Sequence, residues 1–166
     1  MKTPVLVSEE EYLHSSYDPD CDYVDGVVEE RNVGETDHSA VQIAVAAYFY
    51  ERRKQWGVTV LPEQRVQVSP TRFRVPDVCV VVGPKPKEQI IRTPPLICIE
   101  ILSPDDRLSR VRERLNDYLR FGVPYAFLLD PETRKAYRWT TAGMTEVSEL
   151  RTENPETVVP LEALFE

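Results

Sequence analysis

Two apolar runs, each interrupted by one carboxylate, constrain the fold more than any other feature of this sequence. Asp77 opens the run DVCVVV, and Glu100 lies late in the run LICIEIL. Short continuous runs rich in valine and isoleucine are typical of strands that are buried on both faces. A carboxylate in such a strand has a large desolvation cost unless a partner compensates for its charge. We therefore expect both acids to have a definite partner, and we expect the two strands to be neighbours.

A helix and a third strand follow these two runs. Residues 103–105 are expected to cap and start the helix, because proline is favoured near the first helical turn. Its apolar stripe includes Leu115 and Tyr118, and Gly122 is expected to end it. Residues 123–129 are then predicted as another buried strand. A strand–strand–helix–strand unit is thus the expected core of the chain.

Shorter elements are predicted on both sides of this unit. The pattern gives a short helix (9–14), a hairpin (22–28) that turns at Asp25-Gly26, and a long helix capped by Thr36 or Asp37. Two strands (58–68 and 73–82) precede the unit, and a hairpin (135–150) and a docking tail follow it.

Length and composition favour a soluble globular protein with one sizeable core. The chain has 166 residues, of which 42% are hydrophobic and 29% charged. No apolar run approaches the ~20 residues that a membrane span needs, and the N-terminus lacks the pattern of a signal peptide. Cysteines Cys21, Cys79 and Cys98 form no CxxC pair, which suits a reducing compartment. We expect a cytoplasmic protein without membrane contact.

The net charge of −8 argues against a protein that coats nucleic acid without regard to sequence. Affinity for the phosphate backbone comes mainly from lysine and arginine. The charge does not exclude an enzyme that acts on nucleic acid, because a cluster of metal-binding acids itself lowers the net charge.

Three kinds of partner could compensate for the buried charge of Asp77 and Glu100: an arginine, a hydrogen-bond network or a metal ion. Two carboxylates close together suit Mg²⁺ or Mn²⁺, which keep several waters and contact phosphate oxygens. Such an ion can activate a water and stabilise charge on a phosphodiester. In the alternative interpretation, each acid pairs with an arginine for structural reasons.

A series of short motifs carries a resemblance to a known family. The motifs are VPD (75–77), IEILSP (99–104), Tyr118 followed by Gly122-Val123, LDP (129–131), and further out DYVDG (22–26), His38 and the LEALF tail. Their order and spacing resemble the Uma family of restriction-endonuclease-like proteins, within the PD-(D/E)XK nuclease superfamily. The resemblance covers most of the chain. It implies a single restriction-endonuclease-like domain (1–166) of the α/β (α+β) class, in which helices flank a central mixed sheet.

The resemblance also implies roles for individual residues. Asp77 and Glu100 would bind Mg²⁺ or Mn²⁺, with the backbone carbonyl of Ile101 as a further ligand. Asp22 would be an additional acid near the site, and His38 a neighbour at the start of the long helix. The implied activity is a metal-dependent endonuclease that hydrolyses phosphodiester bonds in DNA through a metal-activated water.

One position departs from the superfamily pattern. A lysine is expected two residues after the second acid, and Leu102 stands there. In this family the lysine lies in the following helix, where this sequence has Arg114. An arginine can orient a water or hold a phosphate, but it is too basic to accept a proton. The departure leaves open a catalytically silent nuclease-fold protein that acts by binding or assembly.

Several residues near these motifs also have a purely structural interpretation. Arg114 can lie on a solvated helix edge where Arg110 pairs with Glu113 or Asp106, and His38 can be a structural hydrogen-bond partner. We interpret Cys79 and Cys98 as buried apolar residues on the faces that carry the two acids. Because nuclease folds often dimerise to act on both strands of DNA, we expect a homodimer, although no motif indicates it directly.

Overall fold

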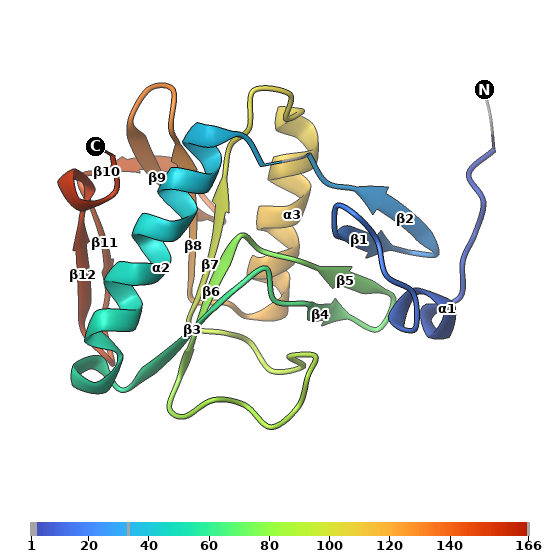
Figure 1. Cartoon of the computed structure of the whole chain (residues 1–166), viewed down its shortest axis with the longest axis horizontal. Helices are drawn as coiled ribbons and strands as arrows, with labels where there is room; N and C mark the ends of the chain where they lie inside the picture. The colour runs from blue at the N-terminus through green and yellow to red at the C-terminus, as the bar shows by residue number, and fades with distance from the viewer. Residues whose placement is uncertain (1–2, 33, 166) are drawn as a thin grey trace.

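The computed structural model describes residues 3–32 and 34–165, and a six-stranded sheet lies at its centre (Figure 1). Its strands are β3 (Val58–Pro62), β6 (Val78–Val82), β7 (Ile97–Ile101), β8 (Tyr125–Asp130), β9 (Lys135–Thr140) and β10 (Gly143–Val147). They follow the spatial order β10-β9-β8-β7-β6-β3. β7 and β8 pair in parallel, and the other neighbours pair antiparallel. The sheet is therefore mixed, as expected.

Two helices, α2 (Thr36–Trp56) and α3 (Leu108–Phe121), pack against the central sheet with different sets of its side chains. Side chains alternate between the two faces of a strand, so each strand contributes to both packing layers. One apolar cluster joins α2 to sheet residues that include Ile97 and Ile99. The other joins α3 to sheet residues that include Cys98 and Leu128. This arrangement confirms the predicted mixed sheet flanked by helices.

A second sheet of four strands lies beside the central one, with the order β2-β1-β5-β4. Its strands are β1 (Cys21–Val24), β2 (Val27–Glu30), β4 (Val66–Ser69) and β5 (Arg72–Arg74). The short helix α1 (Glu9–Leu13) packs on it through Tyr12, which contacts Tyr23 and Phe73. The predicted hairpin at Asp25-Gly26 is confirmed as β1–β2.

The remaining strands, β11 (Glu149–Thr152) and β12 (Thr157–Pro160), form a two-stranded sheet at the opposite end from β1 and β2 (Figure 1). A 3₁₀ turn, η1 (Leu161–Ala163), follows. Leu164 and Phe165 are buried in the cluster that contains α2, which confirms that the tail docks. Among the described residues, none of the helices has the length and apolar character that a membrane span requires.

The two long strands predicted over residues 58–68 and 73–82 are each broken into two. The first break follows Pro62, where Glu63 takes a positive φ of 48°. The second falls at Val75-Pro76-Asp77, between β5 and β6. Proline removes a ladder donor and favours a strand end, so at both places the chain crosses between the two sheets. Asp77 therefore lies at the point where the sheets separate.

Three predicted boundaries are also wrong. The helix after β7 begins at Leu108 rather than at residues 103–105, because the Asp106 carboxylate accepts a hydrogen bond from the Ser103 N–H and closes a turn there. The N-cap of α2 is Glu35, so Thr36 and Asp37 lie inside the helix. β9 pairs with β10 as a hairpin, but β11 pairs with the tail instead.

Candidate active site

The structure brings the predicted acids Asp22, Asp77 and Glu100 to one place, where the two sheets meet. Asp77 precedes β6, Glu100 lies in β7, and the two strands are antiparallel neighbours. Asp22 comes from β1 in the second sheet. Their exposed fractions are 3% for Asp77, 1% for Glu100 and 2% for Asp22. Three buried carboxylates so close together require compensating positive charge.

Arg31 supplies much of that charge. Its Nη2 lies 2.7 Å from Asp77 Oδ1 and 3.9 Å from Glu100 Oε2, and its Nη1 lies 3.7 Å from Asp22 Oδ1. Burial alone would lower the pKa of Arg31, but the three acids raise it above its usual value. Arg31 is thus a permanent cation at the centre of the acids. Sequence reasoning missed it, because a single arginine directly after the hairpin carries no motif that links it to Asp77 or Glu100.

Asp77 is held by contacts to each of its oxygens. Oδ2 accepts a hydrogen bond from the backbone N–H of Ile101 at 2.7 Å, and Oδ1 faces both Arg31 and His38. Burial would raise the pKa of Asp77, but the charge of Arg31 and the hydrogen bond from His38 outweigh it and lower the pKa. Asp77 is therefore ionised at neutral pH.

Of the two carboxylate oxygens of Glu100, one accepts a hydrogen bond and the other has no donor among the described residues. Oε1 accepts a hydrogen bond from the Tyr118 hydroxyl. Oε2 is buried and accepts no hydrogen bond within the described residues, although Arg114 Nε lies 3.4 Å away. Burial raises the pKa of Glu100 to about 7, with the charge of Arg114 opposing this shift and that of Asp77 adding to it. A cation at Oε2 would supply the interaction that this oxygen lacks.

His38 reaches the same place from the first turn of α2. Its Nε2 lies 3.2 Å from Asp77 Oδ1, while its buried Nδ1 has no hydrogen-bond partner in the part of the chain that the structure describes. Burial would lower the pKa of His38, but Asp77 outweighs it and the pKa is raised. The structure therefore places His38 beside the acids, as predicted.

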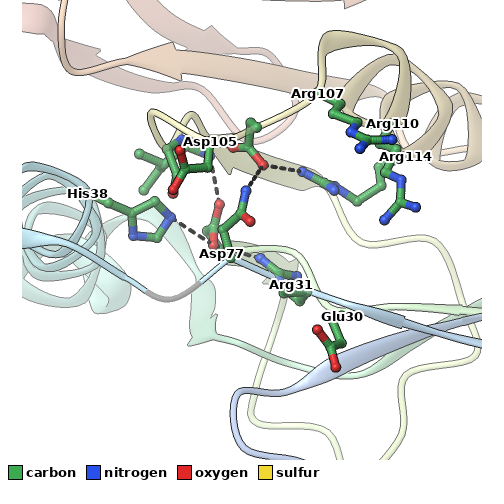
Figure 2. Close-up of a pocket in the computed structure, with 12 residues that line it drawn as sticks. Glu30, Arg31, His38, Asp77, Asp105, Arg107, Arg110 and Arg114 are labelled. Atoms are coloured by element: carbon green, nitrogen blue, oxygen red, sulfur yellow. Dashed lines mark hydrogen bonds and ion pairs between the residues drawn. The ribbon is translucent and has the colours of Figure 1, made fainter.

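The segment that starts α3 lines a pocket of about 180 Å³ beside Asp77 (Figure 2). Arg107, Arg110 and Arg114 gather on one side of it, across from Arg31 and His38. Arg107 and Arg110 are exposed and take part in no ion pair among the described residues. Arg110 is solvated, as the structural interpretation expected, but its predicted pairing is wrong. Glu113 lies near Arg72 and Arg74, and Asp106 lies 3.8 Å from Arg114.

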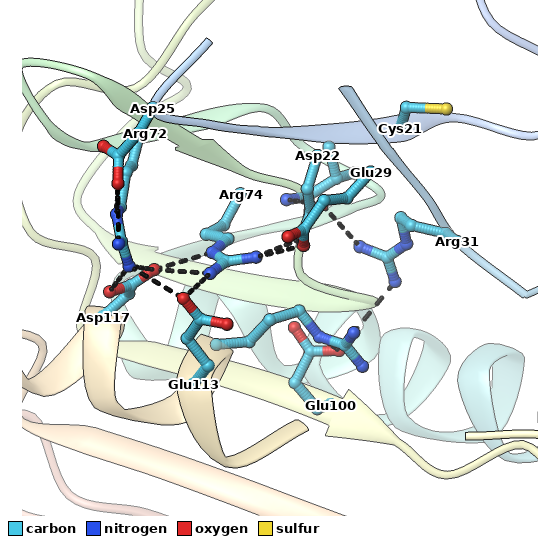
Figure 3. Close-up of polar contacts among 12 residues, drawn as sticks. Cys21, Asp22, Asp25, Glu29, Arg31, Arg72, Arg74, Glu100, Glu113 and Asp117 are labelled. Atoms are coloured by element: carbon cyan, nitrogen blue, oxygen red, sulfur yellow. Dashed lines mark hydrogen bonds and ion pairs between the residues drawn. The ribbon is translucent and has the colours of Figure 1, made fainter. Parts of the chain in front are cut away.

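A second ionic network links β5 of the second sheet to α3 (Figure 3). Arg74 reaches Asp22 Oδ2 at 3.1 Å through Nη1 and Asp117 Oδ2 at 2.7 Å through Nη2, and Arg72 Nη1 also reaches Asp117, at 3.0 Å. Asp22 Oδ1 accepts a hydrogen bond from the Val75 N–H at 3.1 Å. Asp22 is therefore near the site, as expected, but most of its bonding capacity is taken up by Arg74 and the Val75 N–H.

The donor set fits an ion of the Mg²⁺ type rather than a closed transition-metal site. Within residues 3–32 and 34–165, no group of three or more His, Cys, Asp or Glu residues is placed to hold a metal ion. Asp77 and Glu100 nevertheless direct one oxygen each toward Arg31, and that of Glu100 has no hydrogen-bond donor. Mg²⁺ is commonly bound by one or two carboxylates and completes its coordination with water and substrate oxygens.

The cysteines beside the acids are buried, as expected. Cys79 and Cys98 are paired residues of β6 and β7 and pack in the cluster with α3. Burial raises the pKa of Cys79 to about 12 and that of Cys98 well above its usual value. Thiols in such an environment are inert, because the thiolate is the reactive form.

We expect the native protein to react slowly with a thiol reagent such as dithionitrobenzoate at mildly alkaline pH. All three cysteines are free and buried, so both access and ionisation are restricted. The measurement is the rate of absorbance change, and the control is the same protein in denaturant, where all three thiols should react rapidly. A fast phase in the native protein that corresponds to Cys79 would contradict this expectation.

Comparisons with known proteins agree with the fold. A search of the curated proteins finds no match. Among solved structures, the chain is similar to a protein of Anabaena variabilis described as a "putative nuclease belonging to DUF820". The TM-score is 0.80 at 21% identity, over 96% of this chain and 97% of that one. This likeness confirms the restriction-endonuclease-like fold.

The match at the level of families is more specific than the likeness of structures. Residues 9–166 match the profile of the Uma2 family, which is described as "putative restriction endonuclease". The match covers nearly the whole chain, including the three acids, His38 and the arginines of the pocket. The predicted resemblance is thereby confirmed, and the nuclease-like character of the chain follows from it. The chain belongs to the Uma2 family of restriction-endonuclease-like proteins.

Proposed function

We propose that this protein is a metal-dependent endonuclease that hydrolyses phosphodiester bonds in DNA. The observation that carries the proposal is the convergence of Asp77 and Glu100 from neighbouring strands, with Asp77 lining a pocket that arginines also line. The descriptions of the family and of the similar structure both name a nuclease, which is the same class of activity.

In this proposal Asp77 and Glu100 hold Mg²⁺ or Mn²⁺. When bound, such an ion supplies Lewis-acid activation of a water and offsets the negative charge of the phosphate. The backbone carbonyl of Ile101 is the proposed further ligand. Ile101 lines the pocket, and its N–H already fixes Oδ2 of Asp77, so the same residue would orient one ligand and provide another.

The residues around the acids orient them. The Ile101 N–H and the Tyr118 hydroxyl each hold one carboxylate oxygen, which leaves the other oxygen directed into the cluster. His38 fixes Asp77 from the opposite side through Nε2. Arg114 stands where the resemblance to the family implies a lysine, and its charge beside Glu100 suits the binding of a phosphate rather than the transfer of a proton.

The substrate phosphates would lie along the edge of α3. Arg107, Arg110 and Arg114 are three and four residues apart, a spacing that places them on one side of a helix. Arg107 and Arg110 have no acid partner among the described residues, although the chain as a whole has a net charge of −8. Guanidinium groups without acid partners suit bidentate contacts to phosphate oxygens.

Replacing Arg107 or Arg110 by glutamine should weaken DNA binding to a similar extent for all sequences. Each lost phosphate contact is expected to lower the slope of log K against log salt concentration by about 1. Fluorescence anisotropy with labelled duplex DNA over a series of salt concentrations, with Ca²⁺ in place of Mg²⁺, measures this slope. The control is Arg120→Gln at the far end of the same helix, and an equal loss there would contradict the assignment.

Cleavage of supercoiled plasmid DNA by the purified protein tests the proposal as a whole. We expect nicked and linear products with Mg²⁺ or Mn²⁺ and none with EDTA. Intact plasmid under all conditions, together with no binding of either ion, would overturn it. The homodimer and the cytoplasmic location stay predictions.

A catalytically silent nuclease-fold protein that acts by binding or assembly is the second candidate. The observation that favours it is the position of Arg31 among the acids, and the resemblance to the family implies a lysine where this chain has Arg114. Activity that appears only after Arg114→Lys would support a decayed enzyme. Metal-dependent cleavage by the natural sequence would exclude this candidate.

A further inference from the structure

We infer that Arg31 is an internal counter-ion that a divalent ion displaces, so that Arg31 and the metal compete for the same oxygens of Asp77 and Glu100. The inference rests on the metal site of the proposed function. It assigns to Arg31 a role in setting metal affinity, which no motif of the chain indicated.

The first argument is the position of the guanidinium. A single nitrogen, Nη2 of Arg31, lies nearest to Asp77 Oδ1 and also faces Glu100 Oε2. These are the two oxygens that the Ile101 N–H and the Tyr118 hydroxyl leave available. A cation that used both carboxylates would have to occupy the space that Nη2 fills.

The second argument is the balance of charge. Asp22 has Arg74 as a close partner and Glu100 has Arg114, whereas Arg31 is the one arginine paired with Asp77 among the described residues. Removing Arg31 without replacement would leave a buried carboxylate compensated by His38 alone. A divalent ion restores that charge, and it repels a guanidinium at the same position.

The third argument is the imperfect fit of Arg31. Its Nη1 is buried without a hydrogen-bond partner, and so is Oε2 of Glu100. The 3.9 Å between Nη2 and Oε2 is too long for a hydrogen bond. The guanidinium donates to Asp77 but leaves Glu100 Oε2 without a donor, as expected of a group that a better-fitting cation displaces.

The fourth argument is the room available for displacement. Arg31 follows directly after β2 and lines two pockets, one of about 180 Å³ and one of about 280 Å³. The smaller pocket is also lined by Arg107 and Arg110 (Figure 2). A displaced Arg31 would therefore lie where the proposed function places the substrate phosphate.

Calorimetric titration with Mg²⁺ and Mn²⁺ tests the inference on the full chain without DNA. Arg31→Met keeps the length of the side chain and removes the competing charge, so we expect metal to bind about tenfold tighter or more. The matched control is Arg110→Met, which removes a charge from the same pocket without a contact to the acids. We expect that control to change the affinity by about twofold at most.

Thermal melting gives a readout that does not depend on calorimetry. Without metal, Arg31→Met should melt at a lower temperature than the natural protein, because Asp77 loses its arginine. Saturating Mn²⁺ should raise the melting temperature of the variant more than that of the natural protein, because tighter binding gives a larger shift. A variant that melts lower but has unchanged metal affinity would show that Arg31 is only structural, and would overturn the inference.

The outcomes separate this inference from the proposed function. If the natural protein binds metal through Asp77 and Arg31→Met binds it no better, the inference fails and the proposed function stands. If neither protein binds either ion, both fail. If Arg31→Met does not fold, NMR of the natural protein provides the test. The Nε–H resonance of Arg31 should shift during a Mg²⁺ titration, whereas those of Arg72 and Arg74 should not. An unchanged Arg31 resonance at saturating Mg²⁺ would overturn the inference.

Discussion

Replacing Asp77 by asparagine should abolish the binding of Mg²⁺ and reduce DNA cleavage by a factor of about 100 or more. The amide keeps the shape of the side chain, and its oxygen can still accept the hydrogen bond from the Ile101 N–H. It loses the negative charge at the atom that Arg31 and His38 face. Glu100→Gln should have the same effect through Oε2, while its other oxygen still accepts from Tyr118.

Plasmid cleavage and calorimetry on each variant measure these losses, and a thermal melt establishes that each variant is folded. The matched control is Asp25→Asn, because Asp25 also pairs with an arginine, at 2.8 Å, but lies in the other ionic network. That control should retain cleavage and metal binding. Unchanged cleavage in both Asp77→Asn and Glu100→Gln would exclude the acids from the chemistry.

Replacing Arg74 by methionine should lower the free energy of unfolding by about 3–5 kcal/mol, the typical cost of removing one partner from a buried ion pair. Arg74 is 1% exposed, and its guanidinium lies between Asp22 and Asp117. Both acids are themselves buried, so each would lose a close positive partner without gaining access to water. Urea unfolding of the metal-free protein measures the loss.

Arg72→Met is the control for this prediction, because it removes an arginine from the same strand. The side chain of Arg72 is 23% exposed, and two of its three acid partners are well exposed. Pairs of this kind contribute about 0–1 kcal/mol. Equal losses in the two variants would contradict the view that burial makes Arg74 critical.

The prediction from sequence succeeded where the signal is local. Apolar runs identified β6, β7 and β8, and Gly57 and Gly122 mark helix ends because both take a left-handed conformation, with φ of 64° and 103°. The breaks at Pro62 and Pro76 were missed, because a strand-like apolar pattern resumes soon after each proline, at Val66 and at Val78. The chain is seen to turn at the two prolines only because β3 and β4, and likewise β5 and β6, belong to different sheets.

The candidate site was also predicted unevenly. Asp77 and Glu100 carry their own signal, since a carboxylate within an apolar strand is unusual. Their arginine partner carries none, because Arg31 is 46 residues from Asp77 along the chain and joins it only through the second sheet. A local pattern shows that a buried acid needs a cation, but it does not identify which of the many arginines supplies it.

The way in which arginines compensate for the acids determines when the site can form. Pairing of β6 with β7 brings Asp77 and Glu100 together, the junction of the two sheets adds Asp22, and Arg31, Arg74 and Arg114 accompany them. The polypeptide can therefore complete its folding before it meets an ion, in contrast to small zinc domains, whose folding depends on the metal. Under the proposed function, a chelator would therefore stop cleavage without denaturing the protein, and later addition of the ion would restore a site that had kept its shape.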